Sequence, residues 1–200
     1  MKILPWDQRI ARNLVRHLVL TSITPNQLTV FSLLVALSGT AMIAVGKTTY
    51  LNWGVGLFVL ARFLDHFDGE LARQKAMTSR LGYYLDYMSG ALSYSALFVC
   101  LGIGFYQTEI GNWPILLGAS GAASAMISMY TNLCLDKHLD PEGEQDAVGY
   151  PEFSGFELED GIYLLAPITW VGYLMPFFVV SCIGATVYCL WTILILVRQR

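Results

Sequence analysis

Three aspartates stand at helical spacings in the stretch "LDHFDGELARQKAMTSRLGYYLDYMSGAL". At about 100° per helical residue, Asp65 and Asp68 project from one side of a helix. Gly69 and Ala72, which have almost no side chain, lie on the same side. This helix face therefore offers two carboxylates and, beside them, room for a ligand to approach the backbone.

The third aspartate, Asp86, falls in the next predicted helix, where Gly82, Asp86 and Gly90 recur at four-residue intervals and share a face. If the two faces meet, the three carboxylates form a set of hard oxygen ligands that suits Mg²⁺, Mn²⁺ or Ca²⁺ better than zinc or copper. Arg73 lies just beside the first face and can make bidentate contacts with phosphate oxygens. The pattern predicts a metal–diphosphate site, in which the metal stabilises a departing phosphate group.

A buried ion-pair cluster is the structural alternative. Arg62 lies one helical turn before Asp65 and could simply neutralise it. One arginine does not balance three acids, and an ion pair does not explain the glycines on both helix faces. A carboxylate at the rim of a membrane span is costly and is usually functional, so we favour the metal site.

The composition indicates a membrane protein. The chain has 200 residues, of which 55% are hydrophobic and 14% charged, and its mean hydropathy is +0.52. A soluble domain carries about 25% charged residues, and a membrane span needs about 20 mostly apolar residues. Six segments qualify as spans, near residues 26–46, 51–71, 83–106, 113–135, 160–175 and 177–197. The fifth is the weakest, because it is short and Pro167 interrupts it.

The segment before the first span predicts an amphipathic helix lying in the membrane interface. Apolar residues recur there at Trp6, Ile10, Leu14 and Leu18, and arginines occupy the other side at Arg9, Arg12 and Arg16. This spread of arginines does not fit a cleavable signal peptide. We therefore expect an all-α integral membrane protein with one domain, residues 1–200. Residues 1–22 form the interfacial helix and residues 23–200 a six-helix bundle, with a cytoplasmic loop at about 136–159.

Positive charge gathers on one side of the membrane if the N-terminus is cytoplasmic and six spans follow. Ten of the twelve basic residues then lie inside, at Lys2, Arg9, Arg12, Arg16, Arg73, Lys75, Arg80, Lys137, Arg198 and Arg200. Both termini and the Asp65–Asp86 stretch then face the cytoplasm. The net charge of −3 says little about nucleic acid, and we expect no nucleic-acid partner. A transporter is disfavoured, because its site would be expected near the middle of the bilayer and these acids lie at one rim.

The acid–glycine spacing resembles the signature of the CDP-alcohol phosphotransferase (CDP-alcohol phosphatidyltransferase) family, D-x2-D-G-x2-A-R-x8-G-x3-D-x3-D. It stands in this sequence as Asp65, Asp68, Gly69, Ala72, Arg73, Gly82, Asp86 and then Gly90. The N-terminal amphipathic helix, "TPNQLT" and the six spans also resemble the family, over essentially the whole chain. The resemblance implies membrane enzymes of phospholipid synthesis that transfer a phospho-alcohol group from a CDP-linked donor to a hydroxyl acceptor and release CMP. It also implies Mg²⁺ or Mn²⁺ as cofactor and a homodimer.

The resemblance also implies roles for individual residues. The metal ligands would be Asp65, Asp68 and Asp86, with Asp86 also in the catalytic group. The CDP site would be lined by Asp65, Gly69, Ala72, Arg73 and Gly82, with help from Asn26 in the first span. The expected location is the inner or plasma membrane of a bacterium or archaeon, with the active site on the cytoplasmic side.

Gly90 departs from the signature, because the family's last aspartate would ligate metal and deprotonate the acceptor hydroxyl. Three interpretations stay open. A carboxylate from "FELEDG", Glu157, Glu159 or Asp160, could act as the base; such acids at a helix start also serve as caps. Alternatively, the acceptor is already acidic or water is the base, and Gly90 makes room for a larger acceptor. In the third interpretation, the chain binds CDP-lipid and metal without standard turnover. His66 and His138 are further base candidates, because imidazoles titrate near neutral pH.

Overall fold

The computed structural model describes the backbone of residues 6–108, 110–139, 152–153 and 156–198, and the side chains of residues 10–108, 110–136 and 161–198. The helices are α1 (Trp6–Val19), α2 (Pro25–Ala44), α3 (Thr48–Lys75), α4 (Arg80–Tyr106), α5 (Trp113–Leu139), α6 (Leu165–Trp170) and α7 (Leu174–Arg198). A 3₁₀ helix, η1 (Leu158–Leu164), precedes α6. Two short antiparallel strands, β1 (Glu152–Phe153) and β2 (Phe156–Glu157), lie before η1.

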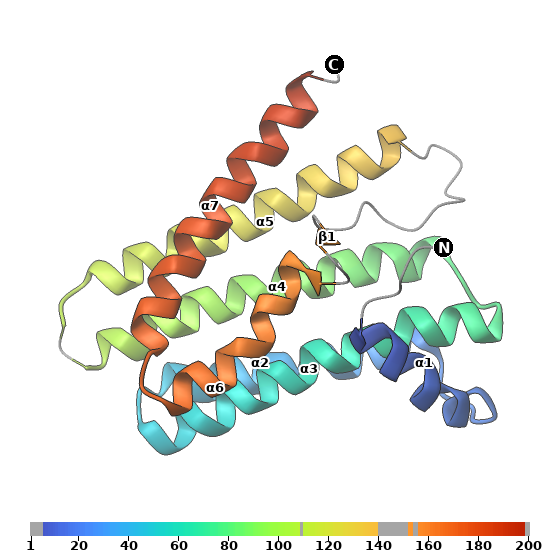
Figure 1. The fold of residues 1–200 in the computed structure, drawn as a ribbon, viewed down its shortest axis with the longest axis horizontal. Helices are drawn as coiled ribbons and strands as arrows, with labels where there is room; N and C mark the ends of the chain where they lie inside the picture. The colour runs from blue at the N-terminus through green and yellow to red at the C-terminus, as the bar shows by residue number, and fades with distance from the viewer. Residues whose placement is uncertain (1–5, 109, 140–151, 154–155, 199–200) are drawn as a thin grey trace.

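The long helices pack in neighbouring pairs, as Figure 1 shows. α2 packs against both α3 and α4, α5 packs against α4, and α7 crosses α5. α1 and α6 both lie on α3. The common core contains the fully buried side chains of Ile43, Phe58, Leu165 and Phe178. α2 is therefore the central helix, and it joins the two helices that carry the acidic motif.

α2 begins where its sequence predicts. Thr24 and Gln27 form a reciprocal capping box, because each side chain accepts a hydrogen bond from the backbone N–H of the other residue (2.9 and 3.4 Å). Pro25 occupies the first helical turn, where its missing N–H costs nothing. The capping box and Pro25 fix the residue at which α2 begins, and they therefore fix the position of Asn26 in its first turn.

Within the part of the chain that the structure describes, three helices are long and apolar enough to cross a membrane by length and composition: α2, α4 and α7. α3 and α5 coincide with two further predicted spans but carry more polar residues, so the number of six spans stays a prediction. The predicted fifth span, residues 160–175, is not one regular helix. η1 and α6 together rise about 23 Å, less than the ~30 Å of a bilayer core. Pro167 lies in the first turn of α6, where its missing N–H and its ring prevent the α-helix from continuing back into η1. α6 ends at Trp170, and Gly172 follows in a left-handed conformation (φ 85°).

α1 has two apolar faces rather than the single one that was predicted. Ala11 and Val15 are fully buried against Leu71 of α3. Ile10 and Leu14, from the predicted apolar face, are 43% and 47% exposed. One face therefore docks α1 on the protein and the other is open, as a helix in the membrane interface requires. The interfacial position itself stays a prediction.

α2 and α3 approach each other closely at a pair of glycines, Gly39 and Gly54. A Cβ atom built on Gly54 would lie 2.6 Å from the carbonyl oxygen of Gly39, and one on Gly39 would lie 2.6 Å from the carbonyl oxygen of Gly54. Small residues at a crossing let two backbones touch, which is a common way for membrane helices to associate.

We expect Gly54→Ala to destabilise the protein by about 1–3 kcal/mol, because the new methyl group meets backbone atoms that cannot move alone. Gly56→Ala is the matched control on the same helix, since a Cβ there meets nothing within 4 Å. Thermal unfolding in detergent measures both variants. Equal melting temperatures for the two variants would contradict this account of the crossing.

Candidate functional site

The acidic motif is assembled across two helices that make few direct contacts with each other and are joined by a short turn. α3 ends at Lys75; Ala76 follows with a left-handed backbone (φ 52°), and the Met77 N–H donates to the Ala72 carbonyl at 2.9 Å. α4 begins after Ser79, whose hydroxyl accepts a hydrogen bond from the Gly82 N–H at 3.0 Å. This short connection places the C-terminal part of α3 beside the N-terminal part of α4.

The structure brings the three predicted aspartates together. One carboxylate oxygen from each of Asp65, Asp68 and Asp86 lies within 4.8 Å of the others. Asp68 is buried, Asp65 is largely buried and Asp86 is exposed. Two ionised carboxylates at this separation repel each other by about 3 kcal/mol at an effective dielectric constant of about 20. The cluster therefore requires positive charge close by.

Arg62 supplies part of that charge. Its guanidinium forms a 3.0 Å ion pair with Asp65, as the structural alternative anticipated, and it lies over the ring of Tyr94 on α4. One unit of positive charge does not balance three carboxylates. A group of hard oxygen atoms with excess negative charge is the chemistry that a divalent cation such as Mg²⁺ or Mn²⁺ requires, so the residues fit such an ion.

Two hydroxyl groups of α2 complete the cluster, and sequence analysis missed both. Thr29 donates a hydrogen bond to Asp68, and Ser32 donates one to Asp65 at 3.3 Å. Both hydroxyl residues are 2% exposed. Their spacing of three residues in an apolar helix is a signal that could have indicated them. They fix the two α3 carboxylates and leave the more exposed Asp86 as the open side of the cluster.

The small residues of the motif surround the acids. A Cβ built on Gly82 would lie 3.1 Å from Oδ1 of Asn26, so the structure places that amide beside the motif glycine. At Gly69 a Cβ would meet only Nη1 of Arg73, at 3.8 Å. Ala72 is half-buried, one turn beyond. The arginine and the alanine thus flank an open stretch of backbone next to Asp68.

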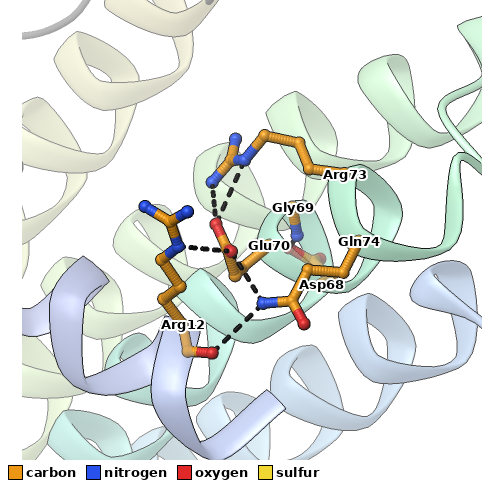
Figure 2. A network of polar contacts seen from close by, with 6 residues as sticks. All are labelled: Arg12, Asp68, Gly69, Glu70, Arg73 and Gln74. Carbon is orange, nitrogen blue, oxygen red and sulfur yellow. Dashed lines mark hydrogen bonds and ion pairs between the residues drawn. The ribbon is translucent and has the colours of Figure 1, made fainter. Parts of the chain in front are cut away.

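Arg73 is held by a residue outside the signature. Glu70 accepts hydrogen bonds from Nε and Nη2 of Arg73 at 3.2 and 3.0 Å. Figure 2 shows Glu70 between Arg73 and Arg12, with Gln74 bonded to the same carboxylate. Sequence analysis gave Glu70 no role.

Gly90, where the signature expects an aspartate, is buried against α5. A Cβ built on Gly90 would lie 2.6 Å from the methyl carbon of Met129. The place where an aspartate side chain would begin is thus filled by a thioether. Among the described residues, no carboxylate takes its place in the aspartate cluster.

A buried acid lies further along the same pair of helices. Asp136 of α5 is 6% exposed and accepts hydrogen bonds from the hydroxyls of Tyr83, at 2.9 Å, and Tyr87. The antiparallel register that sets Gly90 opposite Met129 also sets Tyr83 opposite Asp136, since each step along α4 is matched by one back along α5. Asp136 therefore ties α4 to α5 about two turns from Gly90 and lies outside the aspartate cluster.

Four of the five remaining base candidates have side chains that the structure does not describe. The side chains of Glu157, Glu159, Asp160 and His138 lie outside the described residues. The backbone of Glu157 belongs to β2 and that of Glu159 to η1, and η1 contacts α3. His66 is half-buried on α3.

The family comparison agrees with this geometry. The model of the family described as CDP-alcohol phosphatidyltransferase matches residues 22–197. The chain belongs to this family. Together with its apolar helices, this makes it an integral membrane protein. The match includes every residue of the acid–glycine pattern.

The curated relatives match only part of the chain. A ceramide phosphoethanolamine synthase of Drosophila melanogaster is 36% identical over 93 residues, 43% of this chain and 23% of that protein. A bifunctional IPC transferase and DIPP synthase of Thermococcus kodakarensis is 38% identical over 74 residues, 36% of this chain and 16% of its own. A bifunctional IPC transferase and DIPP synthase of Rubrobacter xylanophilus is 34% identical over 103 residues, which are 50% of this chain and 22% of that protein. The chain spans less than a quarter of the length of each.

Solved structures share the fold. The phosphatidylinositol phosphate synthase of Mycobacterium tuberculosis with CDP-DAG bound superposes with a TM-score of 0.71 at 16% identity, over 94% of both chains. The same enzyme with manganese and citrate gives a TM-score of 0.67 at 16% identity, over 95% of this chain and 88% of the other.

The Gly90–Met129 contact yields a test. We expect Gly90→Asp to lower the melting temperature, because it places a carboxylate at a buried position and displaces the end of the Met129 side chain. Met129→Ala removes that methyl group, so the double variant Gly90→Asp/Met129→Ala should be more stable than additivity of the two single variants predicts, by about 1 kcal/mol or more. Thermal unfolding of the four proteins measures the coupling. If the effects of the two single variants on stability add up in the double variant, a residue other than Met129 determines the cost of a side chain at position 90.

Proposed function

We propose that the chain is a membrane phosphotransferase of phospholipid synthesis, which transfers a phospho-alcohol group from a CDP-linked donor to a hydroxyl acceptor and releases CMP. The observation that carries the proposal is the convergence of Asp65, Asp68 and Asp86 within 4.8 Å, inside the segment that matches the family. The proposal covers the activity, the substrates and the residue roles.

The three aspartates are the proposed metal ligands, with Mg²⁺ or Mn²⁺ as the ion. Carboxylates from two helices suit such ions, and a solved enzyme of the same fold was obtained with manganese. A bound ion would neutralise the donor diphosphate and stabilise the charge on departing CMP. Thr29 and Ser32 orient the α3 carboxylates through the hydrogen bonds described above.

The CDP part of the donor is assigned to the open backbone beside Asp68. Gly69, Ala72 and Gly82 are small enough to admit a bulky phosphorylated ligand, and Arg73 can contact its phosphate oxygens. Asp65 borders the same space. The mycobacterial enzyme with CDP-DAG bound supports a CDP-linked lipid as one class of donor.

The proposed reaction is a substitution at phosphorus. The acceptor oxygen forms a bond to the phosphorus that carries the alcohol, the bond from that phosphorus to CMP breaks, and the hydroxyl proton passes to a base. Asp86, the most exposed of the three acids, lies nearest to solvent and to an arriving acceptor. Glu157 or Glu159 is our proposed substitute for the carboxylate that Gly90 lacks.

The topology and assembly are part of the same proposal. The chain is one membrane domain, residues 1–200, with six spans, an interfacial helix before them and a cytoplasmic loop at about 136–159. The active site and both termini face the cytoplasm of a bacterial or archaeal cell, because that orientation keeps most basic residues inside. Two copies form a homodimer, as the family resemblance implies.

A protein that binds CDP-lipid and metal without turnover is the second candidate. Gly90 favours it, because the position that would carry the acceptor's base holds no side chain and faces a thioether. CMP release by the purified protein, over a panel of CDP-linked donors and hydroxyl acceptors with Mg²⁺ or Mn²⁺, decides between the two. Retained CDP binding with no turnover on the whole panel would establish the second candidate.

We expect Asp68→Asn and Asp86→Asn each to slow CMP release by at least about 100-fold, because each removes a charge from the proposed metal site. Asp136→Asn is the control, since it neutralises a buried acid outside the cluster and keeps an acceptor oxygen for Tyr83 and Tyr87. Its rate should stay within about threefold of the unmodified protein, a change of under 1 kcal/mol. Normal turnover by Asp68→Asn would exclude Asp68 as an essential metal ligand.

The substitute base is tested by Glu157→Gln and Glu159→Gln, made one at a time. Loss of a general base lowers the rate by about 10²–10⁴-fold, and the metal concentration for half-maximal activity should not change. Unchanged rates in both variants would exclude these two residues and leave Asp160→Asn as the remaining test in this segment.

A further inference from the structure

Glu70 is a buried charge that the proposed chemistry does not use. The residue is 7% exposed and lies two positions after Asp68, outside the signature. A buried carboxylate is stable only if hydrogen-bond donors or positive charges surround it. Glu70 has such partners on its own helix and also on α1.

The first partner is Arg73. Oε2 of Glu70 accepts from both Nε and Nη2, so one edge of the planar guanidinium is fixed. Nη1 belongs to the remaining edge and lies 3.8 Å from the position of a Cβ on Gly69. The ion pair thus sets which edge of Arg73 faces the open backbone beside Asp68.

The second set of partners links Glu70 to α1 through Gln74 of α3 and Arg12 of α1. Nε2 of Gln74 donates to Oε1 of Glu70 at 2.8 Å and lies 3.1 Å from the backbone oxygen of Arg12. Nε of Arg12 is 3.8 Å from the same Oε1. Figure 2 shows these contacts joining the two helices through one carboxylate.

α1 is held on these turns of α3 by more than the network. Ala11 and Val15 are fully buried beneath it against α3. Nζ of Lys75 donates to the carbonyl oxygens of Thr21 and Ile23, at 2.7 and 2.8 Å, and so fastens the segment that leads from α1 to α2. The orientation of α1 is therefore defined relative to Glu70.

We propose that Glu70 is a positioning residue for Arg73, and that α1, through Arg12, completes this support, so that docking of the N-terminal helix is coupled to binding of the donor diphosphate. This inference rests on the proposed function, in which Arg73 contacts the donor phosphates. It adds a role for a helix that carries no residue of the signature. α1 acts at the donor site through Glu70 and not only as a membrane anchor.

The experiment compares Glu70→Gln and Arg12→Ala with Arg16→Ala. Arg16 lies one turn further along α1, so its removal takes the same positive charge from that helix without touching Glu70. We expect Glu70→Gln to raise the KM for the CDP-linked donor about tenfold, the effect of losing one charge-assisted hydrogen bond, with kcat changed less than about threefold. Arg12→Ala should raise the KM by a smaller factor, and Arg16→Ala should leave it unchanged.

Two further measurements separate positioning from a merely structural role. Glu70→Gln should have no additional effect on the donor KM when Arg73 is already alanine, because the two residues act as a unit. The metal concentration for half-maximal activity should be unchanged in Glu70→Gln. A lower melting temperature with an unaltered donor KM, or additive effects of Glu70→Gln and Arg73→Ala, would overturn the inference.

CDP affinity, measured by calorimetry on the same variants, distinguishes failure of this inference from failure of the proposed function. If the unmodified protein releases CMP and Glu70→Gln has a normal donor KM and CDP affinity, the inference fails and the function stands. If it releases no CMP but CDP affinity falls in Glu70→Gln and Arg12→Ala and not in Arg16→Ala, the inference stands and the catalytic function fails. Absence of both turnover and CDP binding overturns both.

Discussion

The arrangement of the site depends on the mutual repulsion of three carboxylates that lie close together. Asp65, Asp68 and Asp86 converge at one end of an apolar bundle, where isolated negative charge is expensive. Arg62 and the hydroxyl groups of Thr29 and Ser32 on α2 stabilise part of this charge, but excess negative charge remains. Because the cluster draws on α2, α3 and α4 together, the packing of these three helices is a condition for the site.

The sequence was sufficient to predict the part of the site that follows from periodicity. Residues spaced by three or four positions share a helix face, so the acids and their neighbouring glycines could be grouped without coordinates. Thr29 and Ser32 could not be assigned in this way, because their role depends on which side of α2 meets α3. The same holds for Glu70, whose importance comes from a helix more than fifty residues earlier in the chain.

The long helices agree with the prediction, and the structure adds details that the hydropathy pattern did not contain. Hydropathy alone extended one span over residues 160–175, whereas the chain forms η1 and then α6, with Pro167 in the first turn of α6. α1 buries Ala11 and Val15, which small size and position made inconspicuous beside the larger Ile10 and Leu14. The contact of Gly90 with Met129 depends on the register of α4 against α5, which a single sequence does not encode in any local pattern.

The contact between Gly39 and Gly54 has a consequence for transplanting such a site. Most helix pairs are held 8–10 Å apart by their side chains, whereas here the two backbones touch. The contact lies about two helical turns from Ser32, and it helps to keep the short hydroxyl side chains of α2 within reach of the aspartates on α3. A designer who copied the acids and hydroxyls onto another helix pair would also have to copy the small residues that set the approach of the two helices. Two residues without side chains thus contribute to the geometry of the polar ones.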